Sequence, residues 1–261
     1  MRPARGFGPL AALGRTEPVM SGVSIVIPVF NEELGLPDTL TALEKLNPKP
    51  SEILVVDGGS EDRTVRVAEE AGVRCIISPK KGRGAQVNFG ASQAQNEIVC
   101  VLHADTILPI DAVTVIQQTL ADRRIALASF TPRVVGEKGT RWGSTLHNWV
   151  KTWYIPMLAR PRDFLRGARL LYGDHAMFFW QSDFLRVGGC DERAAIMEEA
   201  ELCLKLAKIG RVKIVPRWVL TSDRRIARLG RWRANWLYCK VGVLWAMGKR
   251  EALGDQYHDI R

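Results

Sequence analysis

The chain of 261 residues lacks several features that would assign it to a class at once. Its five cysteines are widely spaced and include no C-x-x-C pair, which argues against a disulfide framework or a zinc ribbon and favours a reducing cytosol. It has no run of 18 apolar residues, so no transmembrane helix is predicted. Residues 1–20 have no signal-peptide core and are expected to be a disordered leader, with Met20 as an alternative start.

Two nucleotide-binding signatures are also missing. The first predicted strand runs into Pro28-Val29-Phe30-Asn31, without the G-x-G-x-x-G of a dinucleotide fold, and there is no P-loop. The glycines of Gly82-Arg83-Gly84 follow the third predicted strand and lack a third glycine at the right spacing. NAD-dependent and P-loop functions are therefore disfavoured.

Charge is unevenly distributed along the chain. The net charge is +9, but residues 205–261 contain 14 Lys and Arg and 4 Asp and Glu, a net of +10. This segment suits contact with phosphate groups, nucleic acid or an anionic membrane surface; a solvated surface explains it equally well. With 46% apolar and 25% charged residues, the composition is otherwise that of a globular protein.

Strands and helices are predicted to alternate in the first 105 residues. Apolar, β-branched runs predict strands over 24–29, 52–56, 74–77 and 98–102, and helical patterns lie between them over 34–46, 60–71 and 84–94. This order predicts βαβ units with right-handed crossovers, and so an α/β fold with a mostly parallel sheet and flanking helices.

Three of these strands end in polar turns. Asn31-Glu32, Asp57-Gly58-Gly59 and His103-Ala104-Asp105 would meet at one edge of a parallel sheet, where α/β proteins bind ligands. A carboxylate at that edge, such as Asp105, is suited to hold a divalent cation against a phosphate. The alternative for Asp105 is that it caps the next turn or helix.

The motifs together resemble family-2 glycosyltransferases, which have the GT-A fold. The resemblance covers about residues 23–226. It rests on Ile27–Glu33, Val55–Ser60 with Asp62 and Thr64, His103–Asp105, Gly173–His175, Gly188–Asp191 and Met197–Leu202. The loop at Lys81–Gly84 and the segment Thr221–Arg225 look most like a bacterial subgroup named arsenosugar-biosynthesis or radical-SAM/selenodomain-associated glycosyltransferases.

The resemblance implies roles for the strand-end residues. Asp57 would bind the nucleotide base. Asp105 would ligate Mn²⁺ or Mg²⁺ on the diphosphate of the donor. His103 takes the place of the first Asp of the family's Asp-x-Asp motif and is the second expected metal ligand. The other residues expected around the nucleotide-diphosphate sugar, with a UDP-sugar as the family habit, are Pro28, Asn31, Glu32, Lys81, Gly82, Arg83 and Ala104.

The same resemblance places the catalytic base on a later helix. Glu198-Glu199 matches the family's Glu-Asp pair, whose second member is the base, with Glu in place of Asp at 199. For Glu198 the alternative is a solvated helical face or an interaction with the helix dipole. Asp174 is expected over the donor sugar or the acceptor, and a simple turn residue is the alternative.

Two aromatic segments remain. Trp142, Trp149, Trp153 and Tyr154 predict one aromatic helix face, for which core packing is the favoured explanation and a sugar-stacking or membrane-edge surface the alternative. From Arg224 on, arginines lead into an aromatic helix, which suits a membrane-surface contact, a lid over the diphosphate or a dimer interface. Arg224 or Arg225 is expected to reach the diphosphate.

We therefore predict an inverting, metal-dependent glycosyltransferase that moves a sugar from a nucleotide-diphosphate sugar to an acceptor hydroxyl. The alternatives are a nucleotidyltransferase and a basic module that binds nucleic acid or a membrane surface; no nucleic-acid partner is expected. The predicted organisation is a leader over 1–20, a GT-A domain over 21–226 and a basic helical extension over 227–261. A cytoplasmic location, peripheral at the inner membrane face, is expected.

Overall fold

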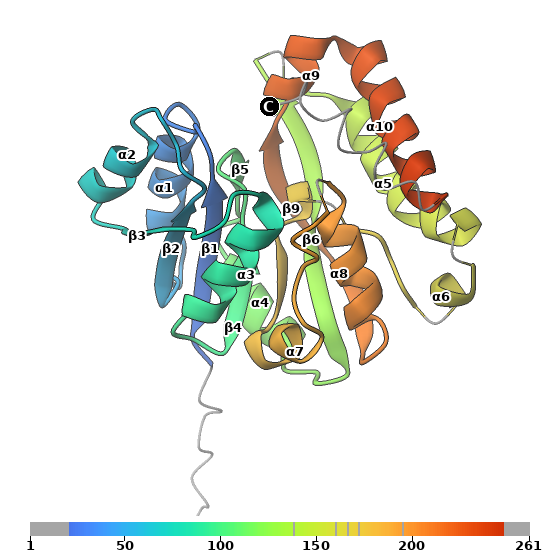
Figure 1. Cartoon of the computed structure of the whole chain (residues 1–261), viewed down its shortest axis with the longest axis horizontal. Helices are drawn as coiled ribbons and strands as arrows, with labels where there is room; N and C mark the ends of the chain where they lie inside the picture. The colour runs from blue at the N-terminus through green and yellow to red at the C-terminus, as the bar shows by residue number, and fades with distance from the viewer. Residues whose placement is uncertain are drawn as a thin grey trace, which may run out of the picture.

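The computed structural model describes residues 21–137, 139–159, 161–165, 167–171, 173–194 and 196–247. The predicted leader and residues 248–261 lie outside the described residues. Within them, one nine-stranded sheet runs in the order β3-β2-β1-β4-β8-β6-β9-β5, with β7 paired to β6 (Figure 1).

The first half of the chain follows the predicted βαβ pattern. Its four strands are parallel to one another, and each predicted helix is present. In chain order the elements are β1 (Val23–Val29), α1 (Leu36–Glu44), β2 (Glu52–Asp57), α2 (Thr64–Glu70), β3 (Arg74–Ile77), α3 (Arg83–Gln93) and β4 (Ile98–Val101). All four residues of β4 are buried, which explains its unbroken apolar sequence.

Helix α2 begins four residues later than predicted. The carboxylate of Asp62 accepts hydrogen bonds from the backbone N–H and the hydroxyl of Thr64, and from the N–H of Glu33 3.2 Å away. Residues 60–63 therefore form a turn against the end of β1, and the helix begins only at Thr64.

The second half is mixed rather than parallel. β8 enters the sheet antiparallel to both β4 and β6, whereas β9 runs parallel to β6. Its elements are β5 (Thr106–Ile107), α4 (Ala112–Leu120), β6 (Ile125–Gly136), β7 (Gly139–Thr140), α5 (Trp142–Ala159), α6 (Pro161–Leu165), the 3₁₀ turn η1 (Gly173–His175), β8 (Met177–Trp180), α7 (Gln181–Arg186), α8 (Glu198–Leu206), β9 (Arg211–Ser222), α9 (Arg224–Leu229) and α10 (Arg231–Ala246). The predicted domain boundary at 226 falls inside α9.

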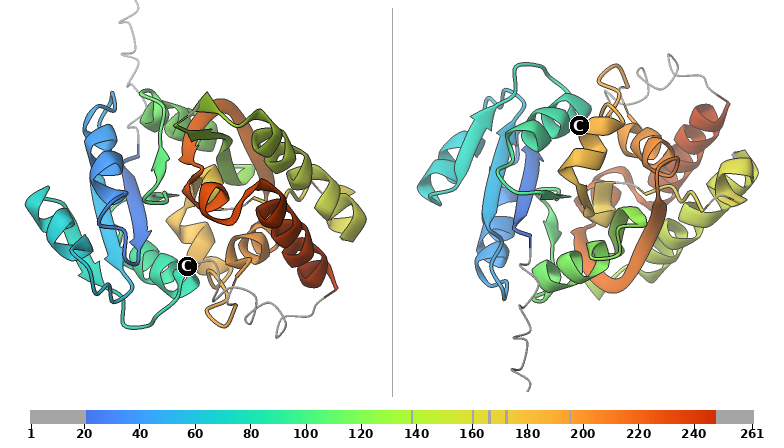
Figure 2. Two further views of the ribbon diagram at one scale, coloured as in Figure 1. Left: turned by 90° about the horizontal axis from the view of Figure 1, so that it is seen from above. Right: turned by 90° about the horizontal axis from the view of Figure 1, so that it is seen from below.

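The sheet curls back on itself. Only residues 102–105 separate β4 from β5, yet β5 lies at the far end of the strand order, paired with the end of β9. The backbone N–H of Ser222 donates to the carbonyl of Asp105 over 3.0 Å. The start of α9 is thereby brought beside the carboxyl end of β4, as the views along the sheet show (Figure 2).

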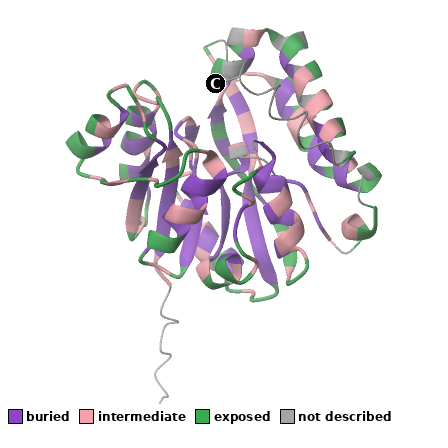
Figure 3. Cartoon of the chain, viewed as in Figure 1, coloured by how far each residue is buried: buried purple, intermediate pink, exposed green. Residues whose placement is uncertain are grey.

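Helices cover both faces of the sheet and define two apolar cores. α1 and α4 pack on one face, and α3, α8 and parts of α5 and α10 pack on the other. The alternation along β8 illustrates this, since Phe178 packs on Phe130 in the first core and Phe179 stacks on Phe184 in the second. The central strands are accordingly buried, whereas β3, most of β9 and the outer helix faces are half-buried or exposed (Figure 3).

Core packing of the aromatic helix face was the wrong expectation for its tryptophans, whereas Tyr154 is half-buried and packs against the second core. Trp142, Trp149 and Trp153 of α5 are 63%, 50% and 36% exposed. Four of the buried positions of α5 are polar, and one of them, Thr145, accepts a hydrogen bond from the backbone N–H of Val134 in β6 over 3.1 Å. Ile155, near the end of the helix, is buried in the second core. Of the described helices, none combines the length and apolarity needed to cross a bilayer.

Candidate functional site

The turns after β1 and β2 are joined into one polar surface. The side-chain oxygen of Asn31, a residue with φ +53°, accepts a hydrogen bond from the N–H of Glu61, and the N–H of Asn31 donates to the Ser60 hydroxyl, both over 2.9 Å. The N–H of Glu32 donates to the hydroxyl of Thr64 over 2.8 Å. These bonds hold the end of β1, where Pro28 lies half-buried, against the end of β2.

Asp57 organises the turn at the end of β2. Its buried carboxylate accepts hydrogen bonds from the N–H groups of Gly59 and Ser60 over 2.8 and 2.9 Å, and from the Ser60 hydroxyl. Both carboxylate oxygens thus have partners within the turn. The contact expected between Asp57 and the nucleotide base would be made in addition to these bonds, and it stays a prediction.

The basic loop before α3 lies over this turn. Gly82 has φ +111°, a conformation that favours glycine, and directly precedes the helix. The Lys81 side chain passes near Gly59, since a Cβ built on that glycine lies 3.8 Å from Lys81 Cε. Arg83 points the other way, toward α8, with its side chain 23% exposed.

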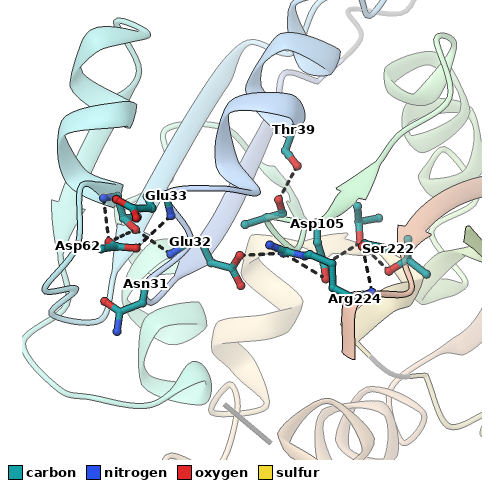
Figure 4. Close-up of polar contacts among 12 residues, drawn as sticks. Asn31, Glu32, Glu33, Thr39, Asp62, Asp105, Ser222 and Arg224 are labelled. Carbon is teal, nitrogen blue, oxygen red and sulfur yellow. Dashed lines mark hydrogen bonds and ion pairs between the residues drawn. The ribbon is translucent and has the colours of Figure 1, made fainter. Parts of the chain in front are cut away.

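The guanidinium of Arg224 lies between Asp105 and Glu32, which follows β1. Arg224 Nη2 is 2.9 Å from Glu32 Oε2 and 3.7 Å from Asp105 Oδ2 (Figure 4). Gly35 leaves room for this arginine, because a Cβ there would come within 2.8 Å of Nη2. Ala104 is buried beside Asp105, and its carbonyl accepts a hydrogen bond from the Thr39 hydroxyl over 2.7 Å. The Arg225 side chain lies outside the described residues.

A second charged cluster lies beside His103, in the turn of residues 103–105 that also carries Asp105. His103 Nε2 and Arg83 Nη1 are 3.8 and 3.7 Å from Glu199 Oε1, and Arg83 Nε is 3.9 Å from Glu198 Oε1. These separations exceed a hydrogen bond. Among the described residues, His103 Nε2 and Glu199 Oε1 are buried atoms that lack a hydrogen-bond partner. Both glutamates are buried, which rules out the solvated helical face for Glu198.

The carboxyl group of Glu199 is held ionised. Its burial raises the pKa, but the adjacent His103 imidazole and Arg83 guanidinium lower it more, so the pKa falls below the usual range. Nε2 of His103 is directed at Glu199. The expected metal site shared by His103 and Asp105 is therefore not supported by the orientation of this imidazole.

Asp174 lies in the 3₁₀ turn before β8 and is bound from α5. The side-chain amide of Asn148 donates to its carboxylate. The neighbouring His175 is fully buried, and burial lowers its pKa to about 4, so it is neutral at physiological pH.

The described residues contain no cluster of three or more His, Cys, Asp or Glu side chains able to hold a metal. A single half-buried carboxylate, that of Asp105, is available instead. Mg²⁺ is often held by one or two carboxylates together with substrate phosphates and water. The residues therefore fit a metal that arrives with a diphosphate.

Two site residues escaped sequence reasoning. Gln86 of α3 is buried, and its side-chain amide donates to the carbonyls of Val29 and Val56 over 2.7 and 2.8 Å, which ties together the ends of β1 and β2. Asn148 reaches Asp174 across 26 residues. The only sequence signal for Gln86 and Asn148 was that each is a polar residue within a helical pattern of apolar residues.

Acidic and basic side chains thus converge at the carboxyl ends of parallel strands in a curled α/β sheet, which is the edge where proteins of this fold class bind their ligands. The family model of "Glycosyl transferase family 2" matches residues 24–187. Because this is more than half of the chain, the chain belongs to glycosyltransferase family 2.

Curated relatives and solved structures agree. The chain is 39% identical over 83 residues to an uncharacterized glycosyltransferase of Mycobacterium tuberculosis, which covers 32% of this chain and 36% of the relative. The match thus spans about a third of the relative's length. Among solved structures, the chain resembles a Pyrobaculum calidifontis mannosyltransferase bound to GDP-Man and Mn²⁺, with a TM-score of 0.64, 16% identity and coverage of 93% of this chain and 68% of that one.

A second solved structure is glucosyl-3-phosphoglycerate synthase from Mycobacterium tuberculosis, in complex with Mn²⁺, UDP and phosphoglyceric acid. The TM-score is 0.60 at 19% identity, over 87% of this chain and 79% of that one. At these identities the likeness establishes the fold alone. The predicted GT-A-like fold and family membership are confirmed.

Proposed function

We propose that the protein is an inverting, divalent-metal-dependent glycosyltransferase that uses a nucleotide-diphosphate sugar and an acceptor hydroxyl. The observation that carries the proposal is the arrangement around residues 103–105. Asp105 faces the cation Arg224 on one side, and His103 faces the ionised Glu199 on the other. In an inverting transfer, the metal ligand and the cation stabilise the departing diphosphate on one side of the anomeric carbon. The carboxylate base takes the proton of the attacking hydroxyl on the opposite side.

The leaving-group side is formed by Asp105, Arg224 and the strand-end turns. Asp105 would hold Mn²⁺ or Mg²⁺, which when bound offsets the negative charge that develops on the diphosphate. In the free enzyme Arg224 is paired with Glu32 and Asp105, and on donor binding it would turn to a phosphate oxygen. Asn31, Glu32, Lys81 and Gly82 would border the nucleoside.

The acceptor side is formed by Glu199, Glu198 and Asp174. Glu199 would take the proton of the attacking hydroxyl, because its buried carboxylate is unprotonated. Asp174, held by Asn148, would hydrogen-bond a sugar or acceptor hydroxyl. Glu198 would hold Arg83 in place beside Glu199.

The test is calorimetric titration with UDP, GDP and their sugars, with and without Mn²⁺, on wild type and Asp105→Asn. We expect one nucleotide to bind only with metal and the variant to lose that binding. Asp111→Asn is the matched control, because Asp111 pairs with Arg217 over 3.1 Å much as Asp105 faces Arg224, but at the start of α4. The proposal fails if Asp105→Asn binds like wild type or if none of these nucleotides binds.

The finer predictions belong to the same proposal. A uridine donor is favoured by the family habit, and the second solved structure is described with UDP. The arsenosugar-related subgroup rests only on the loop at Lys81–Gly84 and the segment Thr221–Arg225. The GT-A domain over 21–226, with a basic extension after it, also stays a prediction.

A further inference from the structure

Helix α5 exposes a row of large apolar side chains, while several of its polar side chains are buried and Ile155 anchors its later turns in the second core. Its exposed positions follow helical spacing along one stripe and are apolar. They are Trp142 (63%), Leu146 (60%), Trp149 (50%), Val150 (39%), Trp153 (36%) and Met157 (48%). Its buried positions include Ser144, Thr145, Lys151 and Thr152. We call the exposed set the α5 stripe.

Helix α10 adds a second apolar stripe next to the first. Trp236, Val243 and Met247, the last one residue past the helix end, are 65%, 57% and 59% exposed and recur at spacings of seven and four. The two helices contact each other and run along the same side of the molecule (Figure 2). An exposed apolar surface of this extent, rich in tryptophan, marks an interaction site.

Basic side chains accompany the tryptophans. The guanidinium of Arg133 lies 5.2 Å from the ring centre of Trp142, and that of Arg169 lies 4.6 Å from the ring centre of Trp153. The ammonium of Lys240 lies 5.3 Å from the ring of Trp236. The sequences of α5, α9 and α10 contain seven Lys and Arg and not one Asp or Glu.

We infer that the α5 stripe, with the stripe of α10, binds the surface of an anionic lipid bilayer. Tryptophan and aliphatic side chains enter the boundary between headgroups and acyl chains, and flanking cations attract anionic headgroups. Charge complementarity favours this occupant over a second copy of the chain, because two copies of this acid-free, basic surface would repel each other.

The same helix connects the bilayer contact to the candidate site. Asn148, which binds Asp174, is adjacent in sequence to the exposed Trp149, and points to the opposite side of α5. Docking of the stripe would therefore leave the acceptor side of the site behind α5, one helix diameter (~10 Å) from the lipid surface. The bilayer inference itself does not depend on the transfer reaction, because binding is measured without donor or acceptor.

The test is co-sedimentation of the full chain with vesicles of phosphatidylglycerol and phosphatidylcholine, and with vesicles of phosphatidylcholine alone. We expect binding to the anionic vesicles, weakened by added salt. The variant Leu146→Ser/Met157→Ser should lose at least about tenfold in partitioning, since two apolar side chains no longer enter the interface. Both residues are exposed, so the variant keeps its fold, which circular dichroism verifies.

The matched control is Ile110→Ser/Leu185→Ser, two side chains of similar exposure (66% and 52%) that lie next to α4 and in α7. It should bind like wild type. The inference is overturned if the chain does not bind anionic vesicles, or if stripe and control variants bind equally. It is also overturned if light scattering shows a dimer that only the stripe variant dissociates, because the stripe would then join two copies of this chain.

Discussion

Arg224 and Glu32 are 192 residues apart in the chain and form an ion pair of 2.9 Å at the mouth of the candidate site. The pair joins the turn after the first strand to the turn after the last one. It forms because β5 pairs with β9, which carries Arg224 back to Asp105. Arg224 is thus held where a donor diphosphate is expected.

The first prediction concerns Arg224. We expect Arg224→Ala to weaken UDP binding in the presence of Mn²⁺ by about 10- to 100-fold, because one charge-assisted hydrogen bond to a phosphate is lost. The fold should be unaffected, since the ion pair with Glu32 is solvent-exposed. Calorimetric titration measures the change. Arg217→Ala, which removes a similar exposed ion pair with Asp111, serves as the control and should bind UDP like wild type.

The second prediction concerns Glu199 as the base. Glu199→Gln should lower kcat by about 10² to 10⁴ while leaving donor affinity within a few fold, because proton removal is lost and the nucleotide contacts remain. Initial rates and donor titration together separate the two effects. Glu201→Gln, on the same helix but bonded to Trp245, should retain most of the activity. A Glu199→Gln enzyme with wild-type kcat would remove Glu199 from the mechanism.

The third prediction concerns the pH dependence of the reaction. Because the pKa of Glu199 is lowered, the carboxylate stays ionised below the pH at which an ordinary Glu is protonated, so kcat should fall only at strongly acidic pH. Arg83→Met removes one of the groups that lower this pKa. The acid limb of the kcat profile should therefore move to higher pH. Lys80→Met, which changes a cation paired with Glu192, should leave the limb in place.

The fourth prediction concerns stability and His175. Burial lowers its pKa to about 4, whereas the unfolded chain takes up that proton near pH 6.5. The unfolded state therefore binds more protons between these values, and stability present above pH 6.5 is lost as pH falls toward 4. Between pH 6.5 and 5 the loss should reach ~2 kcal/mol.

Urea unfolding at several pH values measures this loss. His175→Gln should abolish most of the slope between pH 6.5 and 5, whatever its effect on stability at pH 7.5. His147→Gln is the comparison. Burial and Lys151 also lower the pKa of His147, but this side chain is only half-buried, so its replacement should change the slope less. An unchanged slope in His175→Gln would mean that other groups cause the acid sensitivity.

Local sequence patterns were sufficient for much of the nucleotide-binding half. The strands β1 to β4 and the helices between them lie close to their predicted positions, because short apolar runs and helical spacing report local structure directly. Asn31, Asp57 and Asp105 were located correctly at strand ends for the same reason. Only the start of α2 was misplaced, since Asp62 builds a turn with Thr64.

The partners of those residues were decided by the tertiary structure. Strand pairing between β5 and β9 brings Arg224 to Asp105, and the packing of α8 brings Glu199 to His103. The spacing along α5 likewise predicted an aromatic face, but only the packing against β6 decided that this face points outward. The sequence by itself determined which elements form and which side chains stand at their ends. The long-range contacts that set charge, pKa and exposure depend on how the sheet curls, which no local pattern encodes.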